Sequence, residues 1–130
     1  MHEAGRRILC VDDDTDTREM IEALLTLQGY QVIQARSISE ALSHVVSTTF
    51  DMILIDWIFE DGTGIDLCTK MKQVGVSAPI LFYSGVTDEA NIQLALDAGA
   101  EGFLVKPVDS MDLLSHLERL IKNRDEPSDP

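Results

Sequence analysis

Residues 8–14 read ILCVDDD, in which four apolar residues are followed directly by three acidic ones. The apolar part is typical of a buried strand, and the acids come where that strand would end. Two carboxylates about 4 Å apart at a partly shielded surface repel each other by roughly 4 kcal/mol. The stretch therefore predicts that the three side chains diverge, that one is protonated, or that a cation lies between them.

The rest of the chain repeats the alternation of a short apolar run with a segment of helical periodicity. We expect strands at residues 7–11, 30–35, 51–56, 78–83 and 102–105. We expect helices at residues 16–27, 37–47, 65–74, 88–98 and 109–123, with inward stripes that include Met20, Val46, Leu96 and Met111. Residues 60–64, EDGTG, are expected to form a loop. This alternation predicts an α/β fold with a parallel sheet covered by helices on both faces.

The length of 130 residues fits one domain. We expect this domain at residues 1–122, and a flexible acidic, proline-containing tail or the start of a linker at residues 123–130. Cys10 and Cys68 lack the spacing of a disulfide scaffold or a zinc site, and we expect both to be buried thiols.

The net charge is −13, from 10 basic and 23 acidic residues. Such a surface repels nucleic-acid phosphates and anionic lipid, which argues against direct nucleic-acid binding and membrane association. No stretch reaches the roughly 18 consecutive apolar residues of a membrane span, and the N-terminus lacks the apolar core of a signal peptide. A cytoplasmic location is the expectation.

Polar residues follow four of the expected strands. Asp12 and Asp13 end the first strand, Asp56 the third, Ser84 the fourth and Lys106 the fifth. The carboxyl ends of parallel strands share one edge of the sheet, so these side chains are expected in one crevice. Carboxylate oxygens suit Mg²⁺, and a carboxylate beside Mg²⁺ can attack phosphorus while an amine and a hydroxyl bind the phosphoryl oxygens. This set of groups is complete for reversible phosphorylation of one aspartate.

The chain resembles the receiver domain of two-component response regulators, of the chemotaxis-regulator type, over about residues 6–122. The resemblance rests on ILCVDDD, on MILIDW with Gly64 eight residues after Asp56, on ILFYSG and on GFLVKP. It implies a flavodoxin-like (βα)5 fold, doubly wound, with five parallel strands in the order 2-1-3-4-5. It also implies a signalling switch that catalyses its own phosphorylation rather than an enzyme with turnover.

The resemblance implies a role for each site residue. Asp56 would be the phosphoacceptor, while Mg²⁺ would be bound by Asp13 directly, by Asp12 through water, by Asp56 and by the backbone carbonyl of Ile58. Ser84 and Lys106 would contact the phosphoryl group.

The resemblance also implies a coupled switch and a set of partners. Ser84 would move toward the phosphoryl group while Phe103 turns inward, and the Lys106–Pro107 peptide bond is expected to be cis. The donor would be a sensor histidine kinase or a histidine phosphotransfer protein. The recipient of the signal would be a downstream protein or an output domain that contacts the helix after the fourth strand, the fifth strand and the last helix. A homodimer stays open.

Four positions depart from the pattern of the family. Glu60 stands where many receivers have proline, so we expect a more mobile and more acidic loop, and Thr63 stands where aspartate is common. Ile58 and Val86 are apolar at the two positions that flank the path of the hydrolytic water in receivers. Neither side chain can orient that water, which predicts slow self-dephosphorylation.

Parts of the sequence also fit other classes of function. A calcium-binding loop starting at Asp12 is excluded, because Thr17 and Ala23 stand where it needs glycine and glutamate. A Mg²⁺-dependent phosphatase with an aspartyl nucleophile stays open, although Asp16 stands where the haloacid-dehalogenase type has threonine, and steady turnover would identify it. A flavodoxin-like nucleotide or flavin binder would need a Gly- or Ser/Thr-rich loop where this chain has acids. A receiver-like interaction module that signals without phosphorylation is the remaining alternative.

Overall fold

A five-stranded parallel sheet forms the centre of the protein. The computed structural model describes residues 6–85, 88–106 and 109–125. The strands of the sheet are β1 (Arg7–Val11), β2 (Gln31–Ala35), β3 (Met52–Ile55), β6 (Ile80–Ser84) and β7 (Gly102–Val105). Their spatial order is β2-β1-β3-β6-β7, and all neighbours are parallel. When only these strands are counted, this is the predicted order 2-1-3-4-5, so the doubly wound α/β fold is confirmed.

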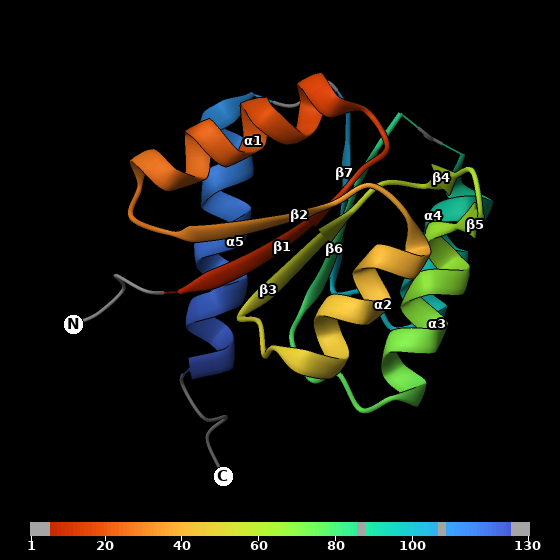
Figure 1. Cartoon of the computed structure of the whole chain (residues 1–130). Coiled ribbons are helices and arrows are strands. Elements are labelled where there is room, and N and C mark those ends of the chain that lie inside the picture. The colour runs from red at the N-terminus through yellow and green to blue at the C-terminus, as the bar shows by residue number, and fades with distance from the viewer. Residues whose placement is uncertain (1–5, 86–87, 107–108, 126–130) are drawn as a thin grey trace, which may run out of the picture.

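Helices cover both faces of the sheet. They are α1 (Thr15–Leu27), α2 (Ile38–Ser47), α3 (Gly64–Gln73), α4 (Glu89–Asp97) and α5 (Ser110–Asp125). Figure 1 shows α1 and α5 on one face and α2, α3 and α4 on the other. Each face has its own apolar cluster: Leu9 and Val11 pack with α2, α3 and α4, whereas Ile8 and Cys10 pack with α1 and α5. Burial on both faces explains why the strands are apolar at successive positions.

Residues 58–63 contain a short hairpin that the sequence did not predict. Strands β4 (Ile58–Phe59) and β5 (Gly62–Thr63) pair in an antiparallel way outside the main sheet. The EDGTG segment is therefore partly paired rather than a simple loop. The sequence did not predict this hairpin because two-residue strands are too short to show any periodicity. Thr63 also begins α3 with a reciprocal capping box to Asp66, and this further orders the segment.

Four apolar residues expected to face inward lie at the surface instead. Met20, Val46, Leu96 and Met111 are 40% to 71% exposed. These four side chains lie outside the buried stripes of their helices, and single apolar side chains are common on protein surfaces. Helix α5 extends to Asp125, two residues past the predicted end. Within the described ranges, no helix combines the length and the apolar character needed to span a membrane.

Candidate functional site

The carboxyl edge of the sheet brings four of the predicted site residues together: Asp12, Asp13, Asp56 and Lys106. Backbone hydrogen bonds continue just past the strand ends: Asp12 N–H donates to Ala35 O, Asp56 N–H to Val11 O, and Lys106 N–H to Ser84 O. These bonds extend the parallel ladder by one residue on three strands. The side chains that follow β1, β3 and β7 therefore start from fixed backbone positions.

Three carboxylates and one ammonium group form the centre of this site. Asp12, Asp13 and Asp56 each offer one carboxylate oxygen, and these oxygens all lie within 4.8 Å of one another. Nζ of Lys106 lies 3.0 Å from Oδ2 of Asp12 and 3.4 Å from Oδ2 of Asp56. The Lys106 ammonium is thus a cation between Asp12 of the opening stretch and Asp56, and it is supplied by the chain itself. Oxygen donors at this spacing also fit a hard divalent cation.

The third acid of the opening stretch diverges from the others. Asp14 is exposed and serves as the N-cap of α1, where its carboxylate accepts hydrogen bonds from both the backbone N–H and the hydroxyl of Thr17. These hydrogen bonds lower the pKa of the Asp14 carboxyl. Its backbone N–H in turn donates to Oδ1 of Asp12 at 2.9 Å. The three consecutive acids therefore have different surroundings and different structural roles.

Burial and charge act in opposite directions at this site. Asp12 is only 2% exposed, and this burial raises the pKa of its carboxyl despite the hydrogen bonds from Asp14 and Lys106. Burial would lower the pKa of Lys106, but the hydrogen bond to Asp12 and the charges of Asp12 and Asp56 outweigh it and raise that pKa. Lys106 therefore stays protonated at neutral pH.

Arg18 holds the backbone of Asp12 in place, and the sequence did not predict this role. Its Nη1 donates to the backbone carbonyl of Asp12 at 2.6 Å, and its Nε donates to Oε1 of Gln34 at 2.8 Å. The amide of Gln34 in turn donates to Glu22. The only sequence signal was a basic residue one turn inside a helix that follows the acids, which is too common to identify a role.

Asp56 is held by the segment that follows it. The Trp57 N–H donates to Oδ1 of Asp56 at 2.7 Å, which leaves Oδ2 toward Lys106. The N–H of Gly64 donates to Trp57 O at 2.6 Å, so the chain returns against the backbone of the acceptor residue. Ile58 opens the hairpin two residues after Asp56, and its side chain is exposed.

An aromatic cluster adjoins Asp56 on the side of the fifth strand of the sheet. The ring of Phe103 stacks on Phe82 with centroids 5.7 Å apart, and Trp57 lies 5.5 Å from Phe82 and 6.1 Å from Phe103. Ser84, at the end of β6, is 2% exposed. The two residues expected to form the switch thus lie on neighbouring strands, Phe103 within β7 and Ser84 at the end of β6. Val86 and Pro107, and with Pro107 the expected cis bond, lie outside the described residues.

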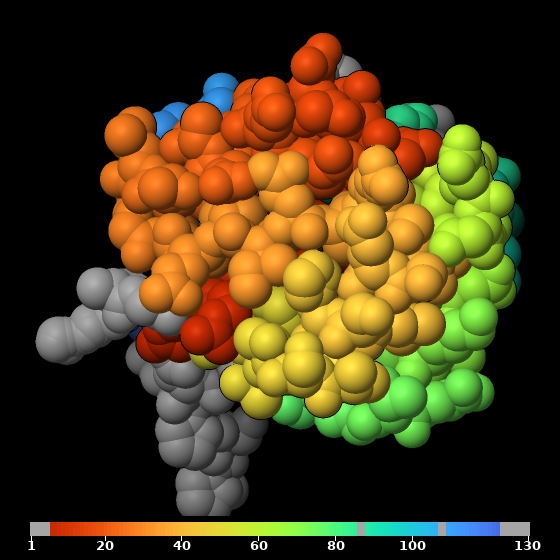
Figure 2. Space-filling view, in the orientation of Figure 1, coloured from red at the N-terminus to blue at the C-terminus, as the bar shows by residue number. Residues whose placement is uncertain are grey.

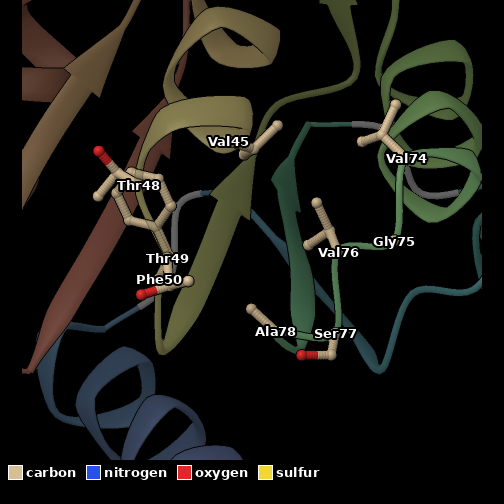
Figure 3. A pocket seen from close by; sticks show the side chains of 9 residues that line it. All are labelled: Val45, Thr48, Thr49, Phe50, Val74, Gly75, Val76, Ser77 and Ala78. Carbon is tan, nitrogen blue, oxygen red and sulfur yellow. The ribbon is translucent and has the colours of Figure 1, made fainter.

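A separate cavity of about 130 Å³ lies at the opposite end of the sheet. It lies between the end of α2 and the turns that precede β3 and β6, and its lining includes Val45, Thr48, Phe50, Val76 and Ala78 (Figure 3). Its lining residues include no titratable side chain, so it offers no acid or base beside its Ser and Thr hydroxyls. The candidate site is therefore the acidic edge, where a doubly wound α/β domain gathers three carboxylates whose spacing fits a cation.

Comparison with known proteins places this domain in a family. Residues 8–118 match the response regulator receiver domain. The chain is 32% identical over 120 residues to the phosphate regulon transcriptional regulatory protein PhoB of Pseudomonas aeruginosa, with 91% of this chain covered. It is 31% identical over 125 residues to the DNA-binding response regulator MtrA of Mycolicibacterium smegmatis, with 95% covered. The chain spans about half the length of these relatives, 52% and 54%.

Solved structures agree with this placement. A two-component response regulator from Clostridium difficile superposes with a TM-score of 0.90 at 26% identity, covering 93% of this chain and 99% of the other. A CheY-like receiver domain protein from Methanospirillum hungatei JF-1 gives 0.89 at 28% identity, covering 92% and 96%. This chain belongs to the family of response regulator receiver domains, the signalling modules of two-component systems.

Proposed function

We propose that this receiver domain accepts a phosphoryl group from a phosphohistidine onto the carboxylate of Asp56, with Mg²⁺ as cofactor. One observation carries the proposal: the oxygens of Asp12, Asp13 and Asp56 lie within 4.8 Å of one another, with the Lys106 ammonium 3.4 Å from Asp56 Oδ2. This arrangement combines a nucleophile, a set of oxygen donors and a fixed positive charge.

The residues of the acidic edge fit Mg²⁺ by their chemistry. We assign Asp13 as a direct ligand, Asp12 as a ligand through water, and Asp56 and the backbone carbonyl of Ile58 as further ligands. Hard oxygen donors with room for several waters are the surroundings that Mg²⁺ prefers. When bound, Mg²⁺ offsets the repulsion between these carboxylates and the oxygens of an incoming phosphoryl group.

The chain's own groups carry the transfer. An oxygen of Asp56 attacks phosphorus, the P–N bond of the donor breaks, and the imidazole leaves with the electron pair and takes a proton from solvent. The Lys106 ammonium and the Ser84 hydroxyl bind the phosphoryl oxygens and stabilise their charge. The backbone N–H of Trp57 fixes the orientation of the Asp56 carboxylate. Asp56 itself is modified, so the domain acts as a switch and not as an enzyme with turnover.

The signal would pass through Ser84 and Phe103. Phe103 already contacts Phe82 and Trp57, so a displacement of Ser84 on the neighbouring strand would change the packing of this ring. Phe103 has no hydroxyl and can respond only by packing. The output surface would comprise α4, β7 and α5, which carry four exposed apolar side chains: Leu94, Leu96, Val105 and Met111.

Partners follow from this function. The donor would be a sensor histidine kinase or a histidine phosphotransfer protein in the cytoplasm, and the two free, buried cysteines fit a reducing compartment. The recipient would be a downstream protein, a second copy of the domain or an output domain. In the last case residues 1–122 form the receiver and residues 123–130 begin the linker. The charge of −13 argues against nucleic-acid contact by the receiver itself.

Intact mass spectrometry tests the proposed function. The wild type is incubated with acetyl phosphate and Mg²⁺, and with each omitted in turn. We expect one added phosphoryl group per chain, which requires both reagents and is absent in Asp56→Ala. Continuous release of phosphate from a phosphate ester would instead identify a phosphatase. An unmodified wild type that still binds its partner would identify an interaction module that works without phosphorylation.

A further inference from the structure

The carboxylate of Asp61 joins the hairpin to the start of helix α2. Its Oδ1 accepts a hydrogen bond from the backbone N–H of Ile38 at 3.1 Å, and its Oδ2 accepts one from Ser39 at 3.2 Å. We propose that Asp61 is a positioning residue for the Mg²⁺ site, because this double contact holds the hairpin and with it the backbone carbonyl of Ile58. The inference rests on the proposed function and adds a residue to it.

The N-terminus of α2 needs the acceptors that Asp61 provides. The first N–H groups of a helix have no partner within the helix. Ser37, the N-cap, accepts the N–H of Glu40, and Asp61 accepts those of Ile38 and Ser39. The hydrogen bond from the Ile38 N–H also lowers the pKa of the Asp61 carboxyl, so this side chain is ionised at neutral pH. A negative charge at a helix N-terminus is favourable, and the contact is therefore a stable anchor for the hairpin.

Packing supports the same anchor. A Cβ built on Gly62 would lie 2.7 Å from Cδ1 of Ile38, so the backbone of the hairpin lies directly on this buried side chain. Phe59 in the hairpin is itself 4% exposed and belongs to the apolar cluster of that face. Gly64, directly after the hairpin, lies against the backbone of Asp56, so the hairpin is held by contacts with both α2 and Asp56. Glu60, the residue expected to make this loop more mobile, lies within the segment that these contacts hold.

The anchor and the acidic edge share one surface. Asp13, Glu60 and Asp61 line the same hollow, together with Ser37 and Ser39. In Figures 1 and 2 the hairpin (yellow-green) lies beside the start of α2 (gold). A shift of the hairpin away from α2 would thus move the backbone of Ile58 relative to Asp13 and Asp56. Partners that orient metal ligands are typically worth about 10- to 100-fold in metal affinity.

Four variants separate this role from simpler ones. Asp61→Ala removes both acceptors, whereas Ser37→Ala removes the acceptor of the Glu40 N–H at the same helix end and leaves the two Asp61 hydrogen bonds in place. Glu60→Gln removes one negative charge from the same turn and the same hollow. Calorimetric titration with Mg²⁺ is expected to show about tenfold weaker binding for Asp61→Ala, and a change of less than about twofold for both controls. Asp61→Asn, which keeps one acceptor oxygen, should lie between Asp61→Ala and the wild type.

A second measurement needs no metal. Amide hydrogen exchange in Mg²⁺-free buffer should become faster in the 58–63 hairpin of Asp61→Ala, and not in that of Ser37→Ala. If the wild type binds Mg²⁺ and Asp61→Ala binds it equally well, this inference fails while the proposed function stands. Equal weakening by Glu60→Gln would also overturn it, because charge alone would then explain the effect. If the wild type does not bind Mg²⁺ at all, the proposed function fails as well.

Discussion

Gly64 lies against the backbone of Asp56 so closely that a Cβ on Gly64 would stand 2.3 Å from the Asp56 carbonyl oxygen. The same Cβ would stand 2.6 Å from Cε1 of Phe82, a fully buried ring. The first residue of α3 and the residue after β3 can therefore approach only because one of them has no side chain. This contact places the return of the chain directly behind the proposed phosphoacceptor.

The first prediction concerns this contact. Gly64→Ala should lower the free energy of unfolding by about 1–3 kcal/mol, because the Asp56 backbone carbonyl and the buried Phe82 ring must shift to admit a Cβ. Urea denaturation measures the loss. Gly85→Ala is the matched control, since a Cβ there meets nothing within 4 Å, and its stability should stay within about 1 kcal/mol of the wild type. Equal stability of the two variants would show that the contact is looser than described.

The second prediction concerns the ion pair of Lys106 and Asp12. Lys106→Met leaves the Asp12 carboxylate, whose side chain is 3% exposed, without its charged partner, and should cost about 1–3 kcal/mol. Asp12→Asn in the same background should recover part of this loss, because the unpaired charge is removed. A double-mutant cycle in urea measures the coupling. Lys122→Met makes the same change at an exposed position on α5 and is the control. A coupling free energy near zero between Lys106 and Asp12 would mean that their ion pair contributes nothing to stability.

A third prediction concerns the crowding of carboxylates. Asp13→Asn should raise the free energy of unfolding by a few tenths to about 1 kcal/mol in metal-free buffer, because it removes one of three neighbouring negative charges. Mg²⁺ should raise the melting temperature of the wild type and have little effect on this variant. Asp16→Asn makes the same charge change outside the group and should keep the response to Mg²⁺. A full response in Asp13→Asn would remove Asp13 from the proposed ligands.

The fourth prediction concerns the two thiols. Cys10 is 1% and Cys68 is 0% exposed, and burial raises the pKa of Cys10 to about 12 and raises that of Cys68 as well. Because the thiolate is the reactive form, iodoacetamide at pH 8 should label neither cysteine in the native protein and both in urea. Mass spectrometry counts the adducts, and rapid labelling of native Cys10 would contradict the burial of β1.

The raised pKa of Cys10 also makes the free energy of unfolding depend on pH. Between the ordinary thiol pKa of 9.0 and the native value of about 12, only the unfolded chain releases the Cys10 proton. The free energy of unfolding should therefore fall as the pH rises above 9, by up to about 1.4 kcal/mol per pH unit from this group. Cys10→Ala should show a smaller fall over the same range.

The fifth prediction rests on the proposed function. Ile58→Asn should shorten the lifetime of the phosphorylated protein about fivefold, because the amide can form a hydrogen bond that orients the hydrolytic water. One such hydrogen bond of ~1 kcal/mol in the transition state corresponds to this change in rate. Release of phosphate after removal of the donor measures this rate. The side chain of Ile58 is 63% exposed, so the substitution should not disturb the core, and Ile58→Val controls for shape. An unchanged rate in Ile58→Asn would exclude this position from the control of hydrolysis.

Local pattern was enough to predict the main sheet and where its strands end. A strand buried on both faces must be apolar at successive positions, so β1 and β3 were visible as apolar runs, and the acids marked their ends. The parallel arrangement then required Asp12, Asp56 and Lys106 to share one edge. Helix faces were predicted less well: Ala95 of α4 is buried as expected, whereas Leu96 beside it is exposed.

By itself, the sequence determined the α/β class, the strand ends and the residue types that meet at the acidic edge, because each depends on a short stretch of chain. Only the tertiary structure decided which acids point together, how Arg18 supports Asp12 and how Asp61 reaches α2. These contacts join side chains to backbone groups across different elements, for example over the 23 positions between Ile38 and Asp61. Such contacts leave no periodic pattern, since they depend on where two elements lie in space and not on the residues next to each other in the chain.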